Sequence, residues 1–135
     1  MSRLAPPSGS APPANATLRP GERIELVPLA EEITRRYFEE FPDDLERYGH
    51  AARDWCVHDN RYILAWAVGD LAGYPMLAKQ VDWLARVLGA RDYPLERLAR
   101  SLELASDVLA ERVPDRRDDV VELLAGAASS VRAGA

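Results

Sequence analysis

Apolar side chains recur every three or four positions along most of this chain, and no other feature constrains its fold as strongly. The first run places four of them at intervals of four, with charged residues between: Leu29, Ile33, Tyr37 and Phe41. On a helix with 3.6 residues per turn, that interval puts the side chains on one face. The spacing therefore predicts an amphipathic helix that begins near Pro28 and ends near Pro42.

Proline and glycine residues divide the rest of the chain into further helical segments. The pattern predicts a short helix in the stretch "DLERY" and helices over about 50–71, 75–88, 94–113 and 115–133. The last three carry apolar stripes: Leu77, Val81, Leu84 and Leu88; Leu95, Leu98, Leu102, Ala105 and Leu109; Val120, Leu124, Ala127 and Val131. No alternating run bounded by turn residues stands out, so no strand is predicted. The expected fold is all-α, a single bundle of four to five helices whose short loops make successive helices antiparallel neighbours.

The first 22 residues differ in composition from the rest. The stretch "MSRLAPPSGSAPPANATLRPGE" holds five of the ten prolines, together with Ser, Ala, Gly and Asn. Such a mixture buries too little apolar surface to offset the entropy that is lost on ordering. We therefore expect a disordered tail over residues 1–22, serving as a tether or linker rather than a recognition arm. Residues 23–133 are expected to form one helical bundle domain, because 135 residues leave no room for two.

Charge and motif content argue against several function classes. The formal net charge of −5 would repel a phosphate backbone, so nucleic-acid binding is not expected. One cysteine forms no internal disulfide, and no apolar run has the length of a signal peptide or a membrane-spanning helix. No phosphate loop, nucleophile elbow, HExxH or CxxC motif occurs. The acidic pairs at 43–44 and 118–119 begin helices, where capping explains them. We expect a cytoplasmic protein that is not an enzyme.

The densest chemistry lies in "RYGHAARDWCVHDNRYILAWAV", residues 47–68. In a helix, four positions of this stretch fall on one face: Trp55, Asp59, Tyr62 and Trp66. Three aromatic rings on one face are expected in the core. Because Asp59 shares this face, its carboxylate would be buried too, which is costly unless it accepts a hydrogen bond from a donor. Three interpretations stay open: a buried acid that fastens helices through Arg53, Tyr48 or an arginine of another helix, an acid that faces a ligand, and an exposed acid.

A second pattern adjoins this stripe. His50, Asp54 and His58 follow at intervals of four and share one helix edge, a spacing that metal sites use. An enclosed metal site needs further ligands from another helix, and the sequence singles out none. We therefore expect a solvated edge and no metal. Cys56 lies nearby and is expected to be a small core residue rather than a nucleophile.

Residues in the middle of the chain form a distinctive ensemble. They are Tyr48, Gly49, Arg53, Cys56, Asp59, Tyr62, Leu64, Trp83 and Leu84, followed by "ARDYP". This ensemble, within about residues 28–114, resembles an uncharacterised all-helical bacterial module that accompanies cobalamin-binding domains in regulatory proteins. The resemblance implies a sensory or interaction role. This sequence lacks the DxHxxG pattern by which such domains coordinate cobalt, and it carries Leu64 where the module more often has histidine, so regulation would depend on a partner.

Two hypotheses of function follow. The first is a non-enzymatic, regulatory module that packs one face against another protein or a second copy of itself. That face comprises Tyr48, Arg53, Trp55, Asp59, Tyr62, Trp66 and Trp83. The second is a small-molecule binder, of the tetrapyrrole type, whose pocket lies between helices, lined by Trp55, Trp66 and Trp83 and gated by His58. The sequence names no particular cofactor.

Overall fold

Six α-helices and one β-hairpin make up the described part of the chain, which in this computed structural model is residue 7 and residues 9–134. The hairpin consists of β1 (Asn15–Arg19) and β2 (Glu22–Glu25). The helices are α1 (Leu26–Glu40), α2 (Asp43–Tyr48), α3 (Ala51–Leu71), α4 (Leu77–Ala90), α5 (Leu95–Arg112) and α6 (Arg117–Gly134), with a 3-10 turn, η1 (Pro114–Arg116), before α6. The predicted helical segments are all present, with ends that differ by a few residues, so the mostly helical fold is confirmed. The described residues form six α-helices, where a bundle of four to five was expected, because the short segment α2 is a helix of its own.

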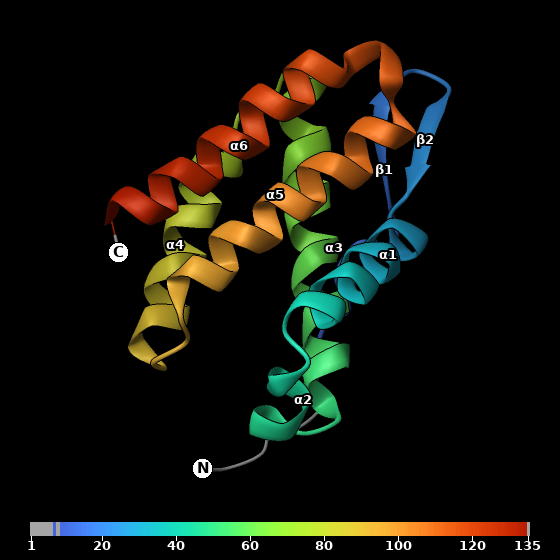
Figure 1. Ribbon diagram of the computed structural model, residues 1–135. Coiled ribbons are helices and arrows are strands. Elements are labelled where there is room, and N and C mark those ends of the chain that lie inside the picture. The colour runs from blue at the N-terminus through green and yellow to red at the C-terminus, as the bar shows by residue number, and fades with distance from the viewer. Residues whose placement is uncertain (1–6, 8, 135) are drawn as a thin grey trace.

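The central helix is α3. It contacts each of the other five α-helices and also β1. The α5 and α6 helices lie side by side and run antiparallel, as Figure 1 shows. In the same view α3 crosses behind this pair instead of running alongside it, so the bundle is irregular.

The apolar stripes of the last three helices form much of the core. Val81 in α4, Leu102 in α5 and Leu124 in α6 are all buried, as their spacing predicts. Burial is most extensive on α5, because α1, α3, α4 and α6 all contact it. The helix-spaced residues that the sequence assigned to the core are thus confirmed on these three helices.

The aromatic stripe of α3 is not part of this core, and that expectation was wrong. Trp55 and Trp66 are half-buried, whereas the fully buried face of α3 carries Ile63, Leu64 and Val68. Aliphatic side chains let neighbouring helices approach closely, which bulky rings prevent. The rings instead line a cavity that they share with α4.

The β-hairpin corrects two predictions, that no strand occurs and that residues 1–22 are disordered. The latter is wrong for residues 15–22, while residues 1–6 and 8 lie outside the described residues. The two strands pair antiparallel, with Ala16 opposite Ile24. Each strand buries one large apolar side chain, Leu18 or Ile24, and the turn between them uses Gly21 at φ +81°. A strand with only one buried apolar residue is hard to recognise in the sequence, particularly within a proline-rich segment.

The segment before the hairpin is also held against the helices. The Arg61 guanidinium in α3 donates hydrogen bonds to the backbone carbonyls of Pro12 and Pro13. Arg19 in β1 pairs with Asp115 in η1 over 3.0 Å. The hairpin is therefore connected to α3 on one side and to the α5–α6 connection on the other.

A buried polar cluster fastens α2 to α1 and α5. The Asp44 carboxylate accepts a hydrogen bond from the Tyr37 hydroxyl and pairs with the Arg97 guanidinium. The Tyr37 hydroxyl also contacts that of Tyr93, which must donate this bond because Tyr37 donates to Asp44. Burial raises the pKa of both tyrosines, so both keep their protons. The capping expected for the acidic pair at 43–44 is therefore wrong for Asp44. Its side chain is only 3% exposed, and α2 has no side-chain cap hydrogen bond.

Among the described residues, no helix combines the length and the apolar character that crossing a membrane would require.

Candidate functional site

A cavity of about 620 Å³ lies between α3, α4 and the buried polar cluster. Its wall includes eight aromatic side chains: Tyr37, Phe38, Tyr48, Trp55, Tyr62, Trp66, Trp83 and Tyr93. We call this cavity the aromatic pocket. Ligand sites in proteins typically enclose about 300–1,000 Å³ and are lined by apolar and aromatic groups with a few polar ones. The aromatic pocket therefore has the size and lining of a small-molecule site.

Rings stacked along α3 form the longest side of the pocket. The Trp55 and His58 rings lie 5.0 Å apart between centroids, those of His58 and Tyr62 5.3 Å, and those of Tyr62 and Trp66 5.9 Å. The first two pairs are edge-on and the last is stacked. Side chains three and four positions apart are neighbours on a helix, so the sequence spacing builds this row of rings locally.

Asp59 lies in the pocket wall beside this row. Its carboxylate is 3.1 Å from His58 Nδ1, and 31% of its side chain remains accessible. Burial raises the pKa of Asp59, although the hydrogen bond to His58 acts in the opposite direction. The Asp59 carboxylate is thus neither fully buried nor fully exposed, and it borders the aromatic pocket.

The partners expected for Asp59 lie elsewhere. The Arg53 side chain is exposed, and its guanidinium carbon sits 5.1 Å from the centre of the Phe38 ring. Tyr48 lines the pocket with its ring 6.2 Å from that of Tyr93. The carboxylate that fastens helices through an arginine and a tyrosine is therefore Asp44, not Asp59.

Asn60 supplies the most unusual polar atom in the pocket wall. The side chain is 2% exposed, and its Nδ2 donates to the Cys56 carbonyl over 2.9 Å. This bond fixes the orientation of the amide, because a flipped amide would bring its oxygen against the carbonyl oxygen. Within the described part of the chain, the Asn60 Oδ1 is buried and has no hydrogen-bond partner. A buried acceptor left unpaired costs about 1–3 kcal/mol, so the atom calls for an explanation.

Cys56 is not arranged as a nucleophile. Burial raises the pKa of its thiol to about 11, so the reactive thiolate is scarce at neutral pH. Its Sγ lies 3.4 Å from Asn60 Nδ2 and packs against the core. The environment is that of a small packed residue, as the sequence predicts.

The edge formed by His50, Asp54 and His58 is divided in the structure. His50 and Asp54 are exposed, whereas His58 turns into the pocket wall towards Asp59 and the neighbouring rings. Among the residues that the structure describes, no three His, Cys, Asp or Glu side chains are placed to hold a metal ion.

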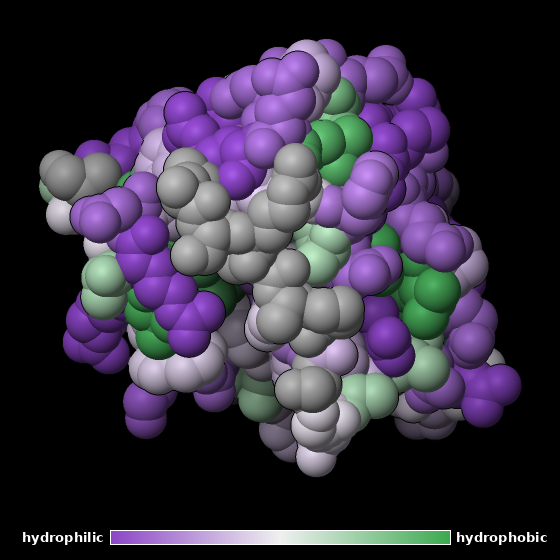
Figure 2. Space-filling model, turned by 90° about the horizontal axis from the view of Figure 1, so that it is seen from below, coloured by the Kyte–Doolittle hydropathy of each residue, from purple (hydrophilic) through white to green (hydrophobic). Residues whose placement is uncertain are grey.

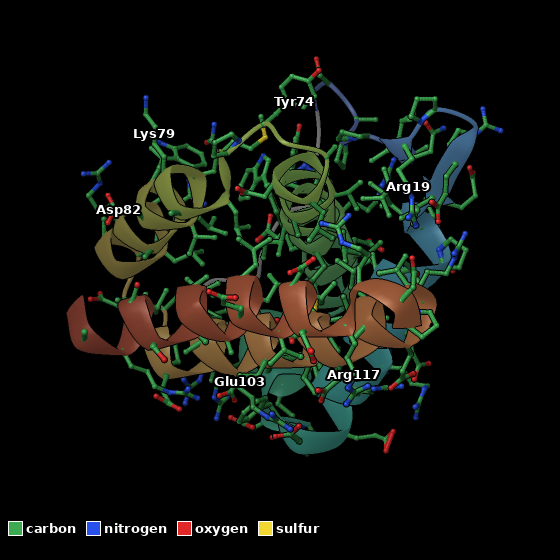
Figure 3. The ribbon with its side chains drawn as sticks, turned by 90° about the horizontal axis from the view of Figure 1, so that it is seen from above. Arg19, Tyr74, Lys79, Asp82, Glu103 and Arg117 are labelled. Atoms are coloured by element: carbon green, nitrogen blue, oxygen red, sulfur yellow. The ribbon has the colours of Figure 1, made fainter. Side chains whose placement is uncertain are left out.

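The other wall of the pocket is α4, and the turn after α3 sets its position. Asp70, near the end of α3, accepts hydrogen bonds from the first backbone N–H groups of α4. Gly73 makes the turn possible with φ +100°, a conformation that other residues rarely adopt. Figure 3 shows Tyr74 in this turn pointing away from the molecule, with Lys79 and Asp82 on the outer side of α4. Trp83 lies on α4 at the rim of the pocket, 51% exposed.

Six of the seven side chains predicted for a functional face line the pocket, and Arg53 does not. Sequence reasoning missed Asn60, Tyr93 and Arg91. Asn60 follows Asp59 directly, and its position on the inner side of α3 was a signal that could have been read as a buried amide. Tyr93 and Arg91 come from the connection between α4 and α5, and nothing local in the sequence places them here.

A second, larger hollow of about 1,060 Å³ lies between α4 and α6. Small residues such as Ala78, Ala85 and Gly126 form much of its wall, and it is more open to solvent than the aromatic pocket. Asn60, with its unpaired acceptor, lines the aromatic pocket instead. The aromatic pocket is therefore the stronger candidate for a ligand.

Comparisons of the chain with models of protein families, with curated proteins and with solved structures gave no match.

Proposed function

We propose that this protein is a non-enzymatic sensory module that binds a small molecule in the aromatic pocket. The observation that carries the proposal is that all three tryptophans of the chain converge on one cavity of ligand size. Aromatic side chains offer large, rigid apolar surfaces, and a polar group such as the Asp59 carboxylate would orient the bound molecule.

The geometry favours ligand binding over the alternative of a flat interaction face. Trp55, Asp59, Tyr62 and Trp66 line the pocket instead of forming an outer surface. On the side of the molecule seen in Figure 2, apart from what the grey atoms cover, hydrophobic residues form separate areas among hydrophilic ones. Protein-docking sites more often form contiguous apolar patches.

Trp83 could couple the binding of a ligand to the binding of a protein partner. Its ring lines the pocket and is also half exposed at the surface of α4. A ligand that packs against this ring would alter the surface that α4 presents. We propose a regulatory role in which a protein partner, or a second copy of the chain, distinguishes the two states of α4.

Titration calorimetry with indole tests the pocket itself, because indole is a small neutral aromatic probe. Val87 lines the pocket from α4, so Val87→Trp would fill it. Val121 is exposed on α6 and does not line the pocket, which makes Val121→Trp a matched control. We expect indole to bind to the wild type and to Val121→Trp. We expect no binding to Val87→Trp. Equal binding to all three proteins, or binding to none, would overturn the proposal.

The resemblance to a module found beside cobalamin-binding domains suggests a tetrapyrrole as the ligand. Visible absorbance tests this class separately. The visible absorbance of the purified chain is recorded alone and after addition of cobalamin, haem or a bilin. A shift that Val87→Trp abolishes would assign a tetrapyrrole to the aromatic pocket. Unchanged spectra with all three would reject that class and leave smaller aromatic ligands.

A further inference from the structure

We infer that the aromatic pocket selects an aromatic molecule whose alkyl side chain carries a protonated amine. This inference rests on the proposed function and deepens it by naming the chemical class of the ligand. It depends on the Asp59 carboxylate and on the aromatic rings that line the pocket wall with it. A protonated amine supplies what this carboxylate lacks, namely donors and a positive charge.

Asn60 adds no hydrogen-bond donor to the pocket. Its Nδ2 is committed to the Cys56 carbonyl, and its Oδ1 is shielded from water. Asp59, by contrast, keeps 31% of its side chain accessible, so its carboxylate can meet a bound molecule. A ligand that pairs with this acceptor must carry an N–H or O–H.

Asp59 and the surrounding rings set the charge requirement. The carboxylate lies in a wall that also includes the rings of Trp55, Tyr62 and Trp66. Aromatic rings attract cations through their electron-rich faces, and a carboxylate beside them adds a full negative charge. Burial disfavours the charged form of Asp59, and a bound cation would offset this penalty. Rings and carboxylate together favour a cation over a neutral or anionic group.

Two positively charged or chargeable groups act in the opposite direction. His58 contacts Asp59 directly, and Arg91 lies exposed at the rim. Both groups lower the pKa of Asp59, and Arg91 does so least. Burial raises this pKa by more than His58 and Arg91 together lower it. An anionic ligand drawn in by Arg91 would still meet the Asp59 carboxylate, which repels it. The wall therefore favours an amine despite the arginine at its rim.

Three probes that share an indole ring test this inference by calorimetry: tryptamine, tryptophol and indole-3-propionate. At neutral pH they carry a cationic, a neutral and an anionic side chain on the same aromatic body. We expect tryptamine to bind at least about tenfold more tightly than either of the others, as a desolvated cation over aromatic rings allows. The preference should disappear in Asp59→Asn, which keeps the shape of the side chain and removes its charge. Asp82→Asn, on the exposed side of α4, should retain it.

The outcomes separate this inference from the proposed function. If tryptophol and tryptamine bind equally, or indole-3-propionate binds best, the amine class is wrong while the pocket stands. If tryptamine is preferred but Asp59→Asn keeps the preference, the assignment to this carboxylate is wrong. If none of the three probes binds, both the inference and an indole-sized pocket are overturned. Circular dichroism of each variant establishes that a lost preference does not reflect unfolding.

Discussion

The Asp70 carboxylate, near the end of α3, accepts a hydrogen bond from the backbone N–H of Leu77, at the start of α4, over 2.7 Å. The same oxygen lies 3.2 Å from the backbone nitrogen of Met76. The first N–H groups of a helix have no partner within it, so Asp70 supplies a cap from across the turn. It thereby fixes where the α4 wall of the aromatic pocket begins.

Replacing Asp70 by alanine should lower the free energy of unfolding by about 1 kcal/mol, the usual effect of a lost helix cap. Urea denaturation followed by circular dichroism measures the change. Asp82→Ala is the matched control on α4, because its ion pair with Arg86 is highly exposed and contributes about 0–1 kcal/mol at most. A loss in Asp70→Ala no greater than in the control would contradict the capping role.

The buried polar cluster should show a larger effect. Asp44→Ala leaves the Arg97 charge and the Tyr37 hydroxyl without their buried acceptor, which should lower the free energy of unfolding by about 3–5 kcal/mol. Asp43 pairs with the same arginine over 3.0 Å but is 46% exposed, so Asp43→Ala should destabilise the protein much less. Similar losses in the two variants would show that the cluster does not fasten α2 as described.

Asp59 should make stability depend on pH in an unusual direction. Because burial raises its pKa, folding favours the protonated carboxyl. Its contribution to the free energy of unfolding is therefore fully present below the unfolded-state pKa and is lost as the pH rises through the higher folded-state pKa. Asp59→Asn removes this dependence, so the variant should gain stability relative to the wild type as the pH rises from the unfolded-state pKa to the higher folded-state pKa of Asp59. Denaturation at several pH values measures the difference, and a constant or falling difference would refute the assignment.

The β-hairpin should contribute to the core despite its short strands. Ile24 is fully buried, so Ile24→Ala should lower the free energy of unfolding by about 2–5 kcal/mol. Thr17, on the paired strand, is exposed, and Thr17→Ala should change stability by no more than about 0.5 kcal/mol. If chemical denaturation finds the two variants alike, the hairpin does not pack as the structure has it.

The helices could be predicted because their apolar stripes are local patterns. Leu102 and Leu109, for example, are buried where a period of 3.6 residues places them. The position of Trp55, Asp59, Tyr62 and Trp66 on one face was also foreseen, since one helix carries all four. What that face meets depends on how α4 approaches, and periodicity within α3 holds no information about it.

The parts that the sequence did not reveal depend on contacts between distant residues. Asp44 meets Arg97, 53 positions away, and Tyr37 meets Tyr93, 56 positions away. Nothing in the local pattern around Asp44 separates a capping acid from a buried one. The hairpin was not predicted for a related reason. Leu18 and Ile24 are buried by residues distant in the sequence, not by their neighbours in the chain.

The three tryptophans provide the most direct test of the central claim, because all of them line the aromatic pocket. Their indole N–H resonances are recorded by two-dimensional ¹H–¹⁵N NMR while tryptamine is added to the full chain. If tryptamine binds in the aromatic pocket, all three resonances shift together and saturate, while backbone signals around Val121 on α6 stay in place. Tryptophan resonances that do not move, or shifts centred on the hollow between α4 and α6, would contradict it.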